Sequence, residues 1–121
     1  MEKIKYYTVA DKKANGKNNE LYRLIPIENI LFDRGMVKKV NEVCSGAAKE
    51  KGIKVLQRNG FCLSKWDSVL KNIKDCKPLD PIIVKQFKKT NYYEVIDGRH
   101  RAVVSLYENF THVPVIIIKS I

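Results

Sequence analysis

The spacing of hydrophobic and polar residues predicts a chain in which strands and helices are mixed. Short, β-rich apolar runs at residues 4–9 and 21–27 predict two extended segments. The polar stretch between them contains an Asn-Gly pair, which is typical of a loop or a long hairpin turn. Pro26 has no backbone N–H, so it should end the second segment or place it at the edge of a sheet.

From residue 36 the apolar positions follow the period of a helix. They recur along one helical face, at Met36, Val37, Val40, Val43, Cys44, Ala47 and Ala48. Asp33 stands near the start of this helix and Gly52 just after its end, where capping residues are expected. We interpret the apolar stripe as core packing rather than as a binding groove.

Two further elements are predicted before Pro78 and Pro81. Short apolar runs flank Asn59 and Gly60, and this arrangement predicts a β-hairpin. A second helix should begin at Ser64, because Ser64-x-x-Asp67 resembles a capping box. Trp66 lies on the apolar face of that helix, so we expect its ring to be in the core.

The last third of the chain predicts a strand, a short turn, a strand, a helix and a final strand. The strands are expected at residues 82–87, 92–96 and 113–118, and the helix at residues 99–109. No internal repeat, low-complexity tract or linker interrupts the chain. We therefore predict one mixed α/β (α+β) domain over residues 1–121.

The composition of the chain argues against several classes of protein. The three cysteines are odd in number and have no CxxC spacing, and only two histidines are present, so neither a disulfide scaffold nor a structural zinc site is expected. No apolar run approaches the ~20 residues of a membrane span. The first residues also lack the apolar stretch of a secretory signal. We therefore expect a soluble intracellular protein with no membrane partner.

The charge of the chain is strongly positive, with a formal net charge of +10. Residues 36–77 alone carry a net charge of +6. Such an excess suits a polyanionic partner, because phosphates attract lysine and arginine from a distance. Most of these residues are lysines spread over polar faces, however, which is equally typical of a solvated surface. The charge alone leaves both interpretations open.

Residues 97–101, with the sequence DGRHR, join a predicted strand to a predicted helix. Gly98 can adopt a backbone conformation that other residues resist. The first amides of the helix would have no helical partner and would carry a partial positive charge, which suits a phosphate. Arg99 and Arg101 would add guanidinium donors. His100 would donate a hydrogen bond or transfer a proton.

Asp97 has three candidate roles at this turn. Its carboxylate would cap the helix, hold a basic side chain in place, or reach a divalent metal that accompanies nucleotide phosphates. In the absence of any ligand, the same residues would form a helix cap followed by exposed basic side chains. The turn alone leaves these roles open.

Four segments, in the family's own order, resemble members of the ParB/sulfiredoxin superfamily. They are DPIIV at 80–84, YYEVI at 92–96, DGRHRA at 97–102 and VPV at 113–115.

An upstream segment, LIPIENI at residues 24–30, also looks like the first strand of this superfamily and the turn after it. The resemblance thus covers about residues 21–40 and 78–118. Residues 41–77 look like a basic insertion, and residues 1–20 like an N-terminal extension or hairpin.

The resemblance implies a small mixed-sheet fold whose turn at a helix N-terminus binds the phosphates of a nucleotide. Sulfiredoxins carry a catalytic cysteine in a GGCHR turn, and Arg99 takes its place here, so sulfiredoxin chemistry would lack its nucleophile. ParB proteins bind CTP with a GERR turn and load onto DNA. Arg99 replaces their glutamate, and we expect no room for their helix-turn-helix and dimerisation regions.

Free serine kinases of the superfamily carry DGHHR, which differs from DGRHR by one residue. Their catalytic glutamate has no secure match, although Asp33 and Arg34 fall near its place. Other members are described as ParB-like nucleases.

The first functional hypothesis is a domain that binds nucleotide phosphates, with NTPase or phosphoryl-transfer activity as an option. The implied cofactor is CTP, ATP or ADP with Mg²⁺. Gly98, Arg99, His100 and Arg101 would bind the phosphates, and Asp97 and His100 would be the catalytic groups. Such transfer depends mostly on positioning and charge stabilisation.

Metal binding would fall to Asp97, Asp33 and Glu28. The second hypothesis is a DNA-binding protein or ParB-like nuclease that uses residues 36–77 as its basic surface. The third is an interaction module that has kept the fold without activity. Whether the chain is an enzyme, and its oligomeric state, stay open.

Overall fold

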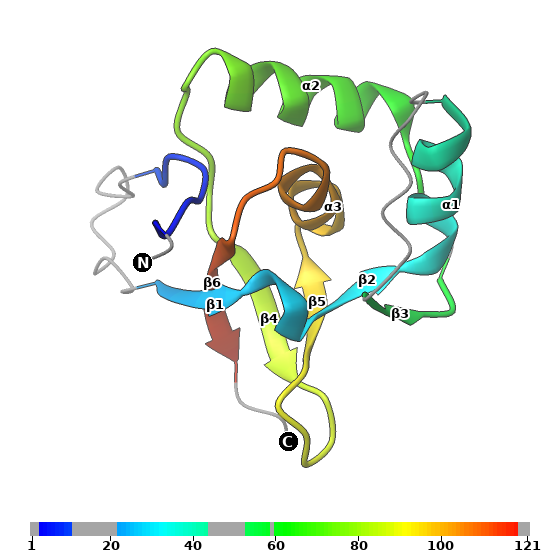
Figure 1. Ribbon diagram of the computed structural model, residues 1–121, viewed down its shortest axis with the longest axis vertical. Helices are drawn as coiled ribbons and strands as arrows, with labels where there is room; N and C mark the ends of the chain where they lie inside the picture. The colour runs from blue at the N-terminus through cyan, green and yellow to red at the C-terminus, as the bar shows by residue number, and fades with distance from the viewer. Residues whose placement is uncertain (1–2, 11–21, 44–52, 59, 119–121) are drawn as a thin grey trace.

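The computed structural model describes residues 3–10, 22–43, 53–58 and 60–118. The described residues form a six-stranded mixed sheet and three α-helices, which confirms the predicted small mixed α/β domain (Figure 1). In chain order the elements are β1 (Arg23–Pro26), the 3-10 helix η1 (Ile27–Asn29), β2 (Ile30–Asp33), α1 (Arg34–Val43), β3 (Lys54–Leu56), α2 (Leu63–Lys74), β4 (Ile82–Gln86), β5 (Tyr93–Asp97), α3 (Arg99–Tyr107) and β6 (His112–Ile118).

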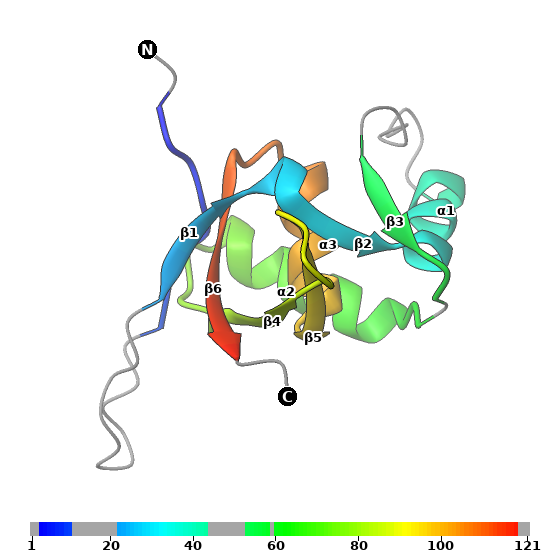
Figure 2. The same ribbon diagram turned by 90° about the horizontal axis from the view of Figure 1, so that it is seen from below.

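The strands lie in the order β1-β6-β4-β5-β2-β3. The pairs β1–β6 and β4–β5 are antiparallel, and the other three pairs are parallel. In Figure 1, α3 is seen end-on between the sheet and α2, so the sheet, α3 and α2 form successive layers. Figure 2 shows the opposite face of the sheet in front, with α2 and α3 behind it.

The core lies between α3 and the central strands. Successive side chains of a strand point to opposite faces, so every second residue of β4 and β6 faces the helix. Ile82, Val84, Val113 and Val115 are fully buried there, and Val103 of α3 is buried in the same cluster. This packing fixes the position of α3, and therefore of its N-terminus, relative to the ends of the strands.

Trp66 joins the outer layer to the core. Its residue is only 4% exposed, and its ring meets the ring of Tyr107 edge-on, with centroids 5.9 Å apart. This geometry is favourable for an aromatic pair because the positive edge of one ring faces the negative face of the other. The prediction that Trp66 is a core residue is confirmed.

The predicted elements of the last third of the chain are confirmed, with small shifts at their ends. Helix α3 ends at Tyr107, two residues before the predicted end, and Asn109 has a left-handed backbone with φ of 59°. Pro26 is the last residue of β1, and β1 is an edge strand, as its missing N–H requires.

The predicted strand at residues 4–9 is wrong. The described residues 3–10 form no strand, and their one bridge pairs Val9 with Leu79. Their backbone groups bond to loops instead. The Lys5 carbonyl accepts the N–H of Thr111 at 3.0 Å, and the Thr8 carbonyl accepts that of Leu79 at 2.9 Å. The segment is therefore a strap across two loops.

The predicted hairpin around Gly60 is also wrong. Strand β3 pairs in parallel with β2, and α2 begins at Leu63, where the second hairpin strand was expected. Residues 54–56 pair with β2, which is distant in the sequence, and a local sequence pattern does not reveal such a partner. The capping box predicted at Ser64 is wrong as well. Ser64 lies inside α2, whose N-cap is Cys62 and has no side-chain cap.

Strand β2 is an element that the sequence pattern did not predict. All four of its residues are buried, so its apolar run shows no alternation between polar and apolar positions. Asp33 ends the strand and caps α1, because its Oδ1 accepts the N–H of Met36 at 3.2 Å. The cap predicted at Asp33 is therefore confirmed.

Some of the sequence-based predictions concern residues that the structure does not describe. The cap at Gly52, the hairpin residue Asn59 and the far end of the helical stripe, from Cys44 onward, lie outside the described residues. Within the described part of the chain, no helix has the length and apolar character needed to cross a membrane.

Candidate phosphate-binding site

The turn between β5 and α3 has the backbone that the sequence predicted. Gly98 is the N-cap of α3 and has φ of 101°, in the left-handed region that favours glycine. The first helical bond runs from the Ala102 N–H to the Gly98 carbonyl at 3.0 Å. The amides of the three preceding residues therefore have no helical acceptor, and the N-cap residue, a glycine, has no side chain to cap them.

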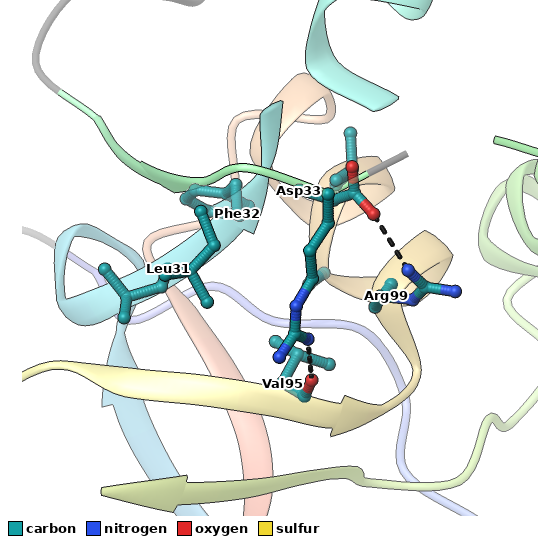
Figure 3. Close-up of a pocket in the computed structure, with 9 residues that line it drawn as sticks. Leu31, Phe32, Asp33, Val95 and Arg99 are labelled. Atoms are coloured by element: carbon teal, nitrogen blue, oxygen red, sulfur yellow. Dashed lines mark hydrogen bonds and ion pairs between the residues drawn. The ribbon is translucent and has the colours of Figure 1, made fainter. Parts of the chain in front are cut away.

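Arg99 is held by a buried carboxylate. Its Nη1 lies 2.9 Å from Oδ2 of Asp33, whose side chain is 1% exposed, whereas the Arg99 side chain is 38% exposed. Figure 3 shows the guanidinium at the start of α3 reaching toward Asp33 at the end of β2. Asp33 thus fixes the start of α1 with one oxygen and Arg99 with the other.

The space behind this ion pair is small. The pocket drawn in Figure 3 has a volume of about 10 Å³ and is lined by Leu31, Phe32, Val95 and their neighbours. A pocket of this size holds one water molecule at most. Any larger ligand must therefore contact Arg99 from its other, exposed side.

Gly60 lies against that guanidinium. A Cβ atom at residue 60 would stand 2.6 Å from Nη1 of Arg99, closer than such atoms approach one another. With Arg99 in this position, a side chain at residue 60 would require the guanidinium to move.

Arg101 is held more loosely than Arg99. Its Nη2 lies 3.4 Å from Oδ2 of Asp97, whose side chain is 71% exposed, whereas the Arg101 side chain is 15% exposed. Its Nε is buried and has no hydrogen-bond partner in the described part of the chain. The carboxylate of Asp97 therefore holds a basic side chain, which is one of the three roles expected for it.

His100 connects the starts of two helices. Its Nε2 accepts the backbone N–H of Cys62, the N-cap of α2, at 2.9 Å. Burial, together with the positive charges of Lys65 and Arg99, lowers the pKa of His100 below its usual value. A neutral imidazole that accepts at Nε2 carries its proton on Nδ1. Nε2 is thus already used in holding α2 beside the turn.

The turn opens onto a groove of about 520 Å³ between α2 and α3. This is within the usual range for small-molecule sites. The side of α3 and β5 contributes Ile96, Asp97, Gly98, Arg99, His100 and Arg101. Helix α2 contributes Ser64, Lys65, Ser68, Val69 and Asn72, and Gly60 and Leu79 complete the lining.

The contribution of α2 was missed from the sequence, which assigned residues 41–77 to an insertion. Ser64, Ser68 and Asn72 are spaced four residues apart, so they form a polar stripe along one helical face. That stripe is a signal in the sequence, but without the fold nothing shows what it faces.

The three residues expected to bind a metal are not brought together. Ile30 pairs with Tyr93 at the beginning of β5, so Glu28 lies at the opposite end of the sheet from Asp97. Asp33 is occupied by Arg99 and the start of α1. Among the described residues, no three His, Cys, Asp or Glu side chains are grouped as metal ligands. These residues do not fit a protein-bound Mg²⁺.

Solved structures of other proteins share this fold. ParB from Caulobacter crescentus complexed with CTP-γ-S is 16% identical, with a TM-score of 0.54 over 84% of this chain and 46% of that one. Sulfiredoxin from Arabidopsis thaliana is 15% identical, with a TM-score of 0.51 over 84% of this chain and 88% of its own. A free serine kinase variant in complex with AMP is 10% identical, with a TM-score of 0.55 over 97% of this chain and 34% of the kinase.

These identities establish likeness of fold only. The chain spans less than half the length of ParB and about a third of the kinase. No curated protein matches the sequence. The model of the ParB N-terminal domain, however, matches residues 38–121, more than two thirds of the chain. The superfamily resemblance seen in the sequence is confirmed, and the chain belongs to the ParB N-terminal domain family.

Proposed function

We propose that the groove binds a nucleoside diphosphate or triphosphate, with the phosphates at the N-terminus of α3. The observation that carries this proposal is the uncapped helix start behind Gly98, which opens onto a groove lined by Lys65, Arg99 and Arg101. Free backbone amides and fixed guanidinium groups together are the usual protein donors to phosphate. The solved complexes of ParB with CTP-γ-S and of the kinase with AMP support the same class of ligand.

Backbone amides and two arginine side chains would each contribute donors to the phosphates. The amides of residues 99–101 would donate to one phosphate, because no other acceptor in the helix is available to them. Arg99 would present the side of its guanidinium that Asp33 does not occupy. Arg101 would add a second cation, and its buried Nε would gain the acceptor that the described residues do not provide.

The proposal concerns binding and does not extend to catalysis. Nε2 of His100 accepts from Cys62, and the carboxylate of Asp97 is turned toward Arg101. Both residues suggested as catalytic groups thus hold structural contacts at the turn. A Mg²⁺ ion would enter with the phosphates as part of the ligand.

Isothermal titration calorimetry with CTP, ATP, ADP and GTP, each with and without magnesium, tests the proposal. We expect one or more nucleotides to bind the wild-type chain and Arg101→Ala to weaken that binding at least tenfold. Arg23→Ala is the matched control, because it removes an exposed arginine from the edge strand β1, away from the groove. Equal affinities for wild type and Arg101→Ala would contradict the proposal.

DNA binding is the second candidate, and a basic surface favours it. Within residues 36–77, the exposed described lysines are Lys38, Lys39, Lys54, Lys65, Lys71, Lys74 and Lys77. If DNA is the ligand, its affinity should fall steeply as salt concentration rises, since each neutralised phosphate releases counterions. Weak retention on DNA that does not change with salt would exclude this candidate.

A further inference from the structure

The two ends of the groove differ in chemistry. At one end, the start of α2 is tied to His100 through the amide of Cys62, and Lys65 and Arg99 supply cations. Asn72 lies eight residues after Ser64, or about 12 Å farther along the helix. Val69, Asn72, Leu79 and Ile96 also line the groove, and none of these four residues is charged.

Leu79 gives this uncharged part of the lining a fixed wall. The N-terminal strap holds Leu79 by two backbone bonds, from the Leu79 N–H to the Thr8 carbonyl at 2.9 Å and from the Ala10 N–H to the Leu79 carbonyl at 2.8 Å. Tyr7, which is buried, donates its hydroxyl to the Asp80 carbonyl at 2.7 Å. Leu79 is therefore a preformed apolar surface.

Arg101 lines the same groove as Leu79 and Asn72. Burial raises the pKa of the Tyr7 hydroxyl, and the positive charge of Arg101 partly opposes that rise. A ligand whose phosphate contacts Arg101 would therefore place its next chemical group beside Leu79 and Asn72.

Asn72 is half-buried and lines this end of the groove. Its side-chain amide forms no hydrogen bond with the described part of the chain, although its backbone carbonyl accepts the N–H of Lys77 at 2.8 Å. A carboxamide has two donor hydrogens and an acceptor oxygen, which match the edges of nucleobases. Inorganic polyphosphate would use neither this amide nor the apolar wall.

We propose that the end of the groove formed by Val69, Leu79 and Ile96 is the subsite for the nucleobase, and that Asn72 determines base specificity by hydrogen bonding to the base edge. The inference rests on the proposed nucleotide-binding function. It predicts that base preference and phosphate affinity depend on different residues.

Calorimetric titrations with inorganic tripolyphosphate and with CTP, ATP, GTP and UTP separate the two claims. The wild type should bind one nucleotide about tenfold more tightly than tripolyphosphate. Asn72→Ala should lose about tenfold in affinity for that nucleotide, the size of one good base contact. Its affinity for tripolyphosphate should not change. Asn72→Asp, which replaces two donors by an acceptor, should change the order of preference among the bases.

Lys71→Ala is the control, because Lys71 is the exposed neighbour of Asn72 on α2 and does not line the groove. It should keep the wild-type order of preference among the bases. Unchanged nucleotide affinities in both Asn72 variants would overturn the inference. If tripolyphosphate binds as tightly as every nucleotide, the phosphate site stands and the base subsite is excluded. If the wild type binds neither, the proposed function fails and the inference fails with it.

A second measurement covers the case in which the variants do not fold. In ¹⁵N-labelled wild-type protein, the side-chain NH₂ signals of Asn72 should shift with the preferred nucleotide and not with tripolyphosphate. An NH₂ pair that responds equally to both ligands, or to neither, would contradict the base contact.

Discussion

The two sides of the α3 turn hold their arginines in opposite ways. On the side of β2 and α1, Arg99 pairs with the buried carboxylate of Asp33 at 2.9 Å. On the side of Leu79, Arg101 pairs with the exposed carboxylate of Asp97 at 3.4 Å, and its Nε has no partner among the residues that the structure describes. Arg99 is thus anchored to a buried carboxylate, whereas Arg101 is paired only with an exposed one.

This difference predicts which substitutions should reduce stability and which should reduce ligand affinity. A carboxylate that is buried needs its cation, because an unpaired charge away from water is costly. An exposed carboxylate is solvated and needs it little. Changes on the Asp33 side should therefore reduce the stability of the fold, and changes on the Arg101 side should reduce ligand affinity.

The largest effect is expected from Asp33→Ala. The substitution removes the cap of α1 and the partner of Arg99 together, so the free energy of unfolding should fall by about 2–4 kcal/mol. Urea denaturation measures this. Asp67→Ala, which removes an exposed carboxylate from α2, should change stability by less than about 0.5 kcal/mol. Similar small losses in both variants would remove the distinction between the two sides.

Gly98→Ala should reduce both the stability of the fold and the affinity for nucleotide. A left-handed backbone with a Cβ costs about 1–2 kcal/mol of stability, and that Cβ would stand 2.6 Å from Nη2 of Arg101 and displace it. Urea denaturation and nucleotide titration should therefore both show losses. In the Arg101→Ala background the loss of stability should persist, while the further loss of affinity should shrink. An unchanged stability would mean that the turn does not need glycine.

Arg101→Ala should show the reverse pattern to Asp33→Ala. We expect nucleotide affinity to fall at least tenfold while the free energy of unfolding changes by less than about 1 kcal/mol, because the Asp97 partner is solvated. Thermal unfolding with and without nucleotide measures both quantities in one experiment. A large loss of stability with unchanged affinity would reverse the roles assigned to the two arginines.

The smallest effect concerns the pH dependence of His100. Its pKa in the folded state is lowered by burial, then by Lys65 and Arg99, so the unfolded chain binds this proton more readily. Stability from the neutral ring is complete above pH of about 6.5 and is lost as pH falls through the folded pKa. Urea denaturation at pH 7.5 and 5.5 should show this loss in the wild type and less of it in His100→Gln.

The sequence predicted the turn better than its surroundings, for physical reasons. Gly98 and the basic residues after it are adjacent in the chain, so their geometry follows from local rules for helix starts. The ion pair between Asp33 and Arg99 joins residues 66 positions apart, and no local pattern encodes it. Asp33 was considered for metal binding because only its charge, and not its partner, is visible in the sequence.

The same distinction applies to the fold. Strands β4, β5 and β6 and helix α3 follow the periodicity of their apolar residues and were predicted close to their observed ends. Strand β2 is buried throughout and shows no alternation, and β3 exists through its parallel pairing with β2. Parallel pairing depends on distant segments, so Lys54–Leu56 was mistaken for part of a hairpin.

The backbone amides at the start of α3 provide the most direct test of the central claim. A ¹⁵N–¹H correlation spectrum, recorded during titration with the tightest-binding nucleotide, follows each amide separately. The account predicts that the amides of Arg99, His100 and Arg101 shift most, because they donate to the bound phosphate. Shifts confined to the lysine-rich faces of α1 and α2, with these three amides unchanged, would contradict it.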